Sequence, residues 1–229
     1  MTGTVAEIWR YPVKSMAGER LDSCLIAETG LLGDRRWALV DGTPNRAGKL
    51  FTNTQDARVM TYHARLPRLN DSGVEVTTPS GETRRLDDDL VADIAAHTER
   101  PLELRDTAGL NFDDSPVLVV NLAALAAFEL AAGVEVDRRR FRANLYIDGL
   151  EPEEELHWLG RRIRAGDAEL EVIRRCERCV VITRHPDTTE ASPELLRILT
   201  QTSETCMGVY CGVTRPGVVA VGHLCGTLS

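Results

Sequence analysis

Two cysteines, Cys176 and Cys179, are separated by two residues in the stretch RCERCVVITRHPDT. Pairs at this spacing occur in zinc sites, in redox disulfides and beside single reactive thiolates. A structural zinc site needs four ligands, yet the chain holds one such pair, and its five histidines are scattered. A redox pair usually opens a helix, whereas the run VVIT after Cys179 predicts a strand buried on both faces. The sequence therefore gives little support to a zinc site or a disulfide.

Three arginines, Arg174, Arg175 and Arg178, stand next to the cysteine pair. Guanidinium groups nearby favour the thiolate form of a cysteine. One cysteine could then be a soft ligand to a cofactor metal, with the other as a bystander. The alternative is that both thiols are only packed in the interior. Simple packing is what we expect for the remaining cysteines, Cys24, Cys206, Cys211 and Cys225.

A second group of candidates is basic and polar, and its members stand near predicted strands. Lys14 and Ser15 follow a Tyr-Pro pair at a strand end, and Arg35 follows Gly-Asp. Arg142 and Asn144 are two residues apart in a predicted strand, so their side chains should share one face. Lysine, serine, arginine and asparagine are residues that bind phosphate-bearing ligands. Taken alone, each of them is more typical of an ordinary surface position at a strand end.

Asn121 adds a different possibility, because it stands at a predicted helix start. Free backbone N–H groups there favour an anion, although a plain N-cap needs no ligand. The motifs GxxxxGK[ST] and GxGxxG are absent, so nucleotide-binding P-loop and Rossmann sites lose their main support. The motifs GxSxG and HExxH are absent as well.

The length, the net charge and the apolar tracts of the chain limit the class of protein. The 229 residues can bury a real core, and the net charge of −8 argues against general binding to nucleic acid or anionic membrane. The start MTGTVAEIWR lacks the features of a secretory signal. The longest apolar tract, residues 116–128, is too short to span a bilayer. We therefore expect a cytoplasmic protein with reduced thiols.

The elements that must position these residues are mostly strands. Alternating or β-branched runs predict strands at residues 5–13, 35–42, 168–173 and 179–183. Residues 73–86 predict a hairpin turned at Pro79-Ser80-Gly81, and residues 207–224 predict another turned at Arg215-Pro216-Gly217.

Three helices complete the pattern. The spacing of apolar residues predicts one helix at residues 89–97. A second is predicted after Asn121, which can cap its first turn, and it ends at Gly133, which can adopt a left-handed backbone. A third begins at Ser192 with proline in its first position. Long β–α alternation is missing. The chain is therefore expected to be mainly β with a few helices, of the α+β class, built as a barrel or sandwich.

Seven short segments together carry a resemblance to a known family. They are YPVKS (11–15), GLLGDRRWALV (30–40), FTNTQ (51–55), SPVLVVNLAAL (115–125), FRANLYIDG (141–149), RCERCVVITRHPDT (175–188) and GVYCGVTRPGVVAVG (208–222). Their types and order resemble the MOSC family, and within it the amidoxime-reducing members and their bacterial relatives. The resemblance implies two β-rich, barrel-like sub-domains of the MOSC and pyruvate-kinase type. The N-terminal MOSC β-barrel domain would cover residues 1–105, and the MOSC domain residues 106–229.

The resemblance also implies site residues. The family's molybdenum-ligating cysteine precedes a turn like His-Pro-Asp-Thr, so Cys179 is the expected metal ligand and catalytic residue. The other cofactor-binding positions would be Lys14, Ser15, Arg35, Asn121, Arg142, Asn144 and Thr183. At position 121 the family often has Ser or Thr. Cys176 has no implied role beyond packing.

The function implied by the resemblance is that of an oxidoreductase with a molybdenum cofactor (molybdopterin). It would reduce N-hydroxylated or N-oxide small molecules. Bacterial relatives carry a ferredoxin domain after the MOSC part, whereas this chain ends at Ser229. Electrons are therefore expected from a separate ferredoxin- or flavin-type protein, without a nucleic acid or membrane partner.

Two other functions stay open. A non-catalytic carrier of the cofactor, or a sulfur-transfer module, would use Cys179 to hold persulfide sulfur instead of a catalytic metal. A binding module whose pocket has drifted would use neither. If the basic residues do not cluster in the folded chain, the binding module is favoured.

Overall fold

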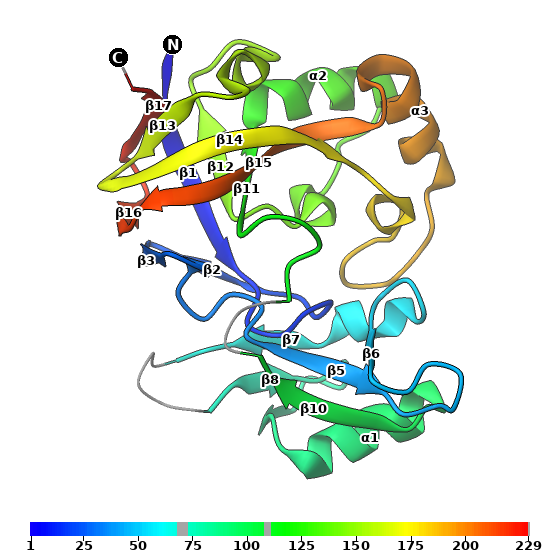
Figure 1. The fold of residues 1–229 in the computed structure, drawn as a ribbon. Coiled ribbons are helices and arrows are strands. Elements are labelled where there is room, and N and C mark those ends of the chain that lie inside the picture. The colour runs from blue at the N-terminus through cyan, green and yellow to red at the C-terminus, as the bar shows by residue number, and fades with distance from the viewer. Residues whose placement is uncertain (68–72, 108–110, 229) are drawn as a thin grey trace.

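The computed structural model describes residues 1–67, 73–107 and 111–228. Among these residues, seven strands close into a barrel, because β12 pairs with β1 across the ends of the sheet. In sheet order they are β12 (Leu145–Asp148), β11 (Val117–Asn121), β15 (Cys206–Arg215), β14 (Ala168–Glu177), β13 (Arg162–Ala165), β17 (Leu224–Thr227) and β1 (Thr2–Arg10). The strand β2 (Glu19–Leu21) extends the sheet from β1 (Figure 1). The expectation of a mainly β, barrel-like fold is confirmed.

Apolar side chains fill the barrel. Val5, Val119, Ile147, Leu170 and Val209 come from five different strands and are completely buried in one cluster. The strand β1 lies at the start of the chain, yet it pairs with β12 and β17. The first strand of the chain therefore completes a barrel whose other strands follow residue 116. The division of the chain after residue 105 stays a prediction.

A second unit lies below the barrel in Figure 1. Its strands are β5 (Trp37–Asp41), β6 (Lys49–Phe51), β7 (His63–Arg65), β8 (Glu75–Thr77), β9 (Thr83–Arg85) and β10 (Leu102–Asp106). The helix α1 (Asp88–Thr98) begins at Asp87, whose side chain accepts from the backbone N–H of Leu90. Leu39, Phe51, Val76 and Ile94 form the buried core of this unit. The hairpin predicted at residues 73–86 is present as the pair β8–β9.

Two helices cover one side of the barrel. The helix α2 (Leu122–Ala132) begins after Asn121 and ends at Gly133, which has a left-handed backbone with φ of 68°. The helix α3 (Pro193–Ser203) starts with proline, as predicted. Phe128 from α2 and Leu199 from α3 are buried in one cluster with Val120 of the barrel. All three predicted helices are confirmed. Side chains cap the starts of α1 and α2, and α3 starts at its proline.

Two strand predictions are wrong. Residues 180–183 form the 3₁₀ turn η4 (Val180–Thr183) instead of a buried strand. Both edges of β14 are already paired, with β13 and β15, and Ile182 packs beside α3 instead. The predicted hairpin at residues 207–224 does not form either. Its second strand, β16 (Gly217–Ala220), pairs with β3 (Ser23–Ala27), which in turn pairs with β4 (Gly30–Leu31).

The expectation that Arg142 and Asn144 share a strand is also wrong. Arg142 ends the 3₁₀ turn η2 (Arg138–Phe141) with φ of 52°, and Asn144 directly precedes β12. Two further 3₁₀ turns are η1 (Ala57–Thr61) and η3 (Glu154–Trp158). In the described ranges, no helix has the length and apolar character needed to cross a membrane.

Candidate functional site

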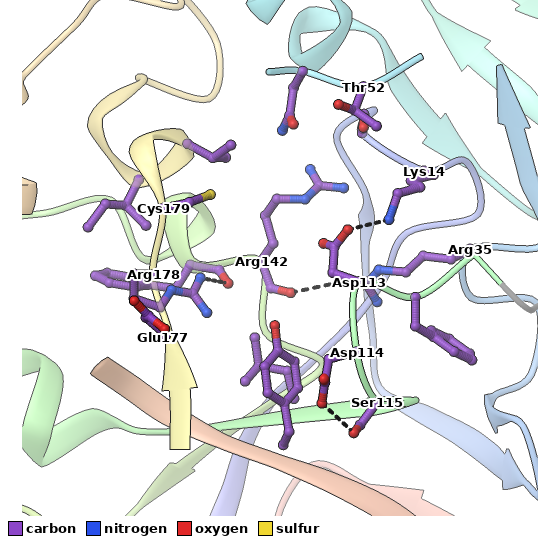
Figure 2. A pocket seen from close by; sticks show the side chains of 18 of the residues that line it. Lys14, Arg35, Thr52, Asp113, Asp114, Ser115, Arg142, Glu177, Arg178 and Cys179 are labelled. Atoms are coloured by element: carbon purple, nitrogen blue, oxygen red, sulfur yellow. Dashed lines mark hydrogen bonds and ion pairs between the residues drawn. The ribbon is translucent and has the colours of Figure 1, made fainter. Parts of the chain in front are cut away.

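A cavity of about 530 Å³ lies between the barrel and the second unit. Its walls come from the loop after β1, Arg35 two residues before β5, the loop after β6 and the segment before β11. The turns η2 and η4 with the residues next to them, and side chains of β11, β14 and β15, complete the walls. Figure 2 shows Cys179 on one side of this space and Lys14 on the other, with Arg142 between them. Segments that are far apart in sequence therefore meet around one opening.

The cavity concentrates positive charge in a chain whose net charge is −8. Three acidic side chains, Asp113, Asp114 and Glu177, are among the described residues that line it. The basic side chains of the lining number six in the described part of the chain: Lys14, Arg35, Arg140, Arg142, Arg174 and Arg178. A cavity with this excess suits an anionic ligand, since low-dielectric walls strengthen its field.

Tyr11 organises two of the arginines. Its buried ring lies beneath the guanidinium carbons of Arg142 at 4.4 Å and Arg35 at 4.9 Å. Burial raises the pKa of Tyr11 to about 12 although both arginines oppose this, so the phenol stays neutral at ordinary pH. Both arginines have a left-handed backbone, with φ of 48° and 52°. These uncommon conformations aim both guanidinium groups at one ring.

Asp34 and Asn144 hold Arg35 from behind. The Asp34 carboxylate accepts from the Tyr11 backbone N–H at 2.7 Å, from Asn144 Nδ2 at 3.2 Å and from Arg35. Burial lowers the pKa of Arg35, but Asp34, Tyr11 and Asp113 together outweigh it and the net direction is upward. Asn144 Oδ1 also accepts from the Leu118 N–H at 3.1 Å. Asn144 therefore ties the barrel to the second unit and orients Arg35.

Lys14 is buried against the segment before β11. Its Nζ donates to the Asn111 carbonyl at 2.8 Å and to Asp113 Oδ1 at 2.5 Å. Burial lowers the pKa of Lys14, and the attraction of Asp113 offsets only part of this effect. The adjacent Ser15 has a left-handed backbone with φ of 72° and also lines the cavity.

The two cysteines of the opening motif occupy different environments. Cys179 is exposed at the start of η4, and its sulfur points into the space that Arg142 enters (Figure 2). Cys176 is 1% exposed and accepts a hydrogen bond from Arg178 Nη1. Of the two, the exposed Cys179 is the thiol that a ligand in the cavity can reach.

The three arginines beside the cysteine pair form hydrogen bonds to groups that the sequence did not predict. Arg174 Nε donates to Asp114 at 3.1 Å, and Arg175 Nη1 donates to Glu204 at 2.6 Å. Arg178 holds Cys176 and the Phe141 carbonyl. The expectation that these guanidinium groups gather around one cofactor thiolate is therefore corrected, since carboxylates compete for two of them.

Most of the expected site residues line the cavity: Lys14, Ser15, Arg35, Arg142, Asn144 and Cys179. Asn121 and Thr183 lie outside its lining. Asn121 caps α2 and donates from Nδ2 to Glu155 Oε2 at 2.7 Å and to the Glu151 carbonyl at 2.8 Å. Thr183 is 3% exposed and donates to the Val180 carbonyl at 2.7 Å. Local capping and turn bonds account for both residues.

Several lining residues were not singled out from the sequence. Asp113 and Asp114 precede β11, and Tyr210 lies under the guanidinium of Arg174 at 5.3 Å from its ring centre. Thr52 and Asn53 belong to the quoted FTNTQ segment, but that segment carried no assigned role. The adjacent acidic residues before a buried strand were the one local signal available.

A cluster of potential metal ligands lies elsewhere. In the part of the chain that the structure describes, the only such group is Asp137, His185 and Asp187, whose ligand atoms lie within 4.8 Å of one another. Arg139 donates to Asp137 Oδ2 and to Asp187 Oδ2, each at 2.6 Å. One guanidinium thus pairs with both carboxylates. Neither Cys176 nor Cys179 belongs to this group, which leaves a zinc site at the pair without support.

Comparisons with known proteins identify two family models in the chain. Residues 103–224 match the MOSC domain, and residues 2–118 match the MOSC N-terminal beta barrel domain. A molybdenum cofactor sulfurase of Drosophila mojavensis is 26% identical over 87% of this chain, which spans 30% of that protein. The human mitochondrial amidoxime-reducing component 1 is 24% identical over 81% of this chain, which spans 67% of that protein.

A solved structure agrees with the fold. The YUAD protein from Bacillus subtilis superposes with a TM-score of 0.56 at 16% identity. The match covers 98% of this chain and 94% of that one. At this identity the likeness concerns the arrangement of strands and helices.

Proposed function

The chain belongs to the MOSC family, and on that premise we propose that it binds a molybdenum cofactor and reduces N-hydroxylated or N-oxide compounds. The observation that carries the proposal is the meeting of an exposed thiol and a basic cavity. Cys179 lies in the same lining as Lys14, Arg35 and Arg142. The names of the relatives, a cofactor sulfurase and an amidoxime-reducing component, agree with this choice.

The residues present fit the two ends of such a cofactor. Molybdopterin carries an anionic phosphate, for which Lys14, Ser15 and the Arg35–Arg142 pair supply donors and positive charge. Its metal prefers soft sulfur ligands, and Cys179 offers an exposed sulfur on the opposite wall. Asn144 would act through Arg35, because its amide already bonds to Asp34 and to the Leu118 N–H.

The bound cofactor would supply the two-electron redox chemistry, as cofactors generally carry the difficult step. The chain's own residues would bind and orient the cofactor and would exclude water from the cavity. In the overall reaction an N–OH or N-oxide oxygen leaves as water, and two electrons and two protons are consumed. The electrons would come from a separate ferredoxin- or flavin-type protein.

A second candidate rests on the exposure of Cys179. An accessible thiol in a basic cavity could carry persulfide sulfur to a bound cofactor, and one relative is named a sulfurase. Mass spectrometry of the purified protein separates the two functions. A persulfide on Cys179 without molybdenum would favour sulfur transfer.

The test of the reductase is turnover of an amidoxime with chemically reduced methyl viologen as the electron donor. The protein is produced in cells that make molybdopterin. We expect amine formation that scales with molybdenum content across preparations. Equal turnover in preparations with and without molybdenum would overturn the proposal.

A further inference from the structure

Cys176 makes a contact that simple packing does not explain. Its sulfur accepts a hydrogen bond from Arg178 Nη1, while the thiol itself is 1% exposed. The two residues stand at alternate positions where β14 ends, and the register with β15 is irregular between Arg175 and Glu177. Residues two apart in extended backbone point to the same side of the chain, which brings these two side chains together.

Arg178 is a charged group with neutral partners. Its guanidinium donates to the Phe141 carbonyl and lies 5.4 Å from the centre of the Phe141 ring. Its Nε is buried and lacks a hydrogen-bond partner among the described residues. Within the same described residues, Arg178 forms no ion pair with a carboxylate, unlike Lys14, Arg174 and Arg175. A guanidinium in this position depends on each acceptor it has.

Arg178 is also tied to the cavity. It lines the cavity together with Cys179, and its backbone N–H donates to the Thr205 carbonyl at 2.8 Å. Burial lowers the pKa of Arg178, whereas Cys176 and Tyr210 raise it, and the net direction is upward. The charge of Arg178 is therefore kept, and it faces the cavity without an acidic partner to neutralise it.

We propose that Cys176 is a positioning residue whose sulfur holds the Arg178 guanidinium in the cavity wall. Removing this acceptor would free the guanidinium to turn away from the wall. The cavity would then bind anions less well, although Cys176 touches no ligand itself. The inference rests on the proposed function only in treating the cavity as an anion site.

The conservative pair Cys176→Ser and Cys176→Ala separates this role from packing. Serine keeps an acceptor at the position, and alanine removes it while leaving a similar small void. A pure packing role predicts that the two variants behave alike. Cys211→Ala is the matched control, because Cys211 is fully buried in the barrel and does not line the cavity.

The first measurement is the arginine side-chain ¹H–¹⁵N NMR spectrum of the protein without metal or ligand, with Arg178 assigned by Arg178→Lys. We expect resolved Nη–H signals of Arg178 in the wild type, in Cys176→Ser and in Cys211→Ala, because a held guanidinium rotates slowly. In Cys176→Ala these signals should average to one. Resolved signals in Cys176→Ala, or averaged signals in the wild type, would overturn the proposal.

The second measurement is calorimetric binding of pyrophosphate to the same metal-free proteins. Cys176→Ala should weaken binding about tenfold, as expected for one charge-assisted bond to the anion. Cys176→Ser and Cys211→Ala should stay within about twofold of the wild type. Equal affinity in all four proteins contradicts the positioning role of Cys176 but leaves the anion site supported. Absence of binding in the wild type contradicts the anion site, and the NMR comparison then still decides the contact.

Discussion

The guanidinium of Arg142 stacks on the ring of Tyr11, with 4.4 Å between its central carbon and the ring centre. Arg35 lies over the same ring, so two like charges share one aromatic residue. Burial lowers the pKa of Arg142, and the charge of Arg35 lowers it further, although Tyr11 opposes both. An anion between the two arginines would relieve this repulsion, which would favour anion binding in the cavity.

Tyr11 is therefore expected to support both the fold and the cavity. Tyr11→Leu removes the ring beneath both arginines and should lower the free energy of unfolding by about 2–3 kcal/mol. Tyr11→Phe loses only the hydroxyl bond to the Ala143 carbonyl, so its cost should stay below about 1.5 kcal/mol. Urea denaturation measures both. Equal losses in the two variants would contradict the stacking role.

Lys14 should make anion binding fall at alkaline pH. Burial lowers its pKa from 10.5, and only the protonated amine attracts an anion. Affinity is thus complete at pH below the lowered pKa and is lost as pH rises through it. Sulfate is the suitable probe, because its own charge does not change over pH 7–10.5. Lys14→Arg should remove the decline, since arginine stays charged. A decline that persists in Lys14→Arg would assign it to another group.

Asn121 should matter for stability and not for the cofactor. Asn121→Ala removes the cap of α2 and leaves the buried Glu155 without this donor. We expect a loss of about 1–3 kcal/mol in the free energy of unfolding. Molybdenum content should match the wild type, whereas Arg142→Gln, at the cavity, should reduce it. A similar fall in molybdenum content for both variants would indicate that Asn121 helps to bind the cofactor.

Local signals in the sequence account for what could be predicted of the fold. The ends of α2 follow from Asn121 and Gly133, because a helix cap acts within one turn, and the start of α3 follows from Pro193 in its first position. The run at residues 180–183 has the composition of a strand but forms a 3₁₀ turn after β14, and Ile182 packs beside α3. Pairing partners are a property of the whole chain.

The site shows the same division. The resemblance to a family brought together Lys14, Arg35, Arg142 and Cys179, which lie in four separate segments. It gave Cys176 no role, because the spacing of the residues does not show that Arg178 bonds to the Cys176 sulfur. The carboxylates that bind Arg174 and Arg175 are remote in sequence from them. Contacts of this kind follow from the folded structure alone.

The central claim is that Cys179 anchors a molybdenum cofactor in the basic cavity. Its most direct test is the molybdenum content of protein purified from cells that make molybdopterin. Cys179→Ser is compared with the wild type, and Cys206→Ser, at a half-buried thiol outside the cavity, is the control. We predict stoichiometric molybdenum in the wild type and in Cys206→Ser, and a large loss in Cys179→Ser. A wild type without molybdenum, or a Cys179→Ser variant that retains it in full, would contradict the account.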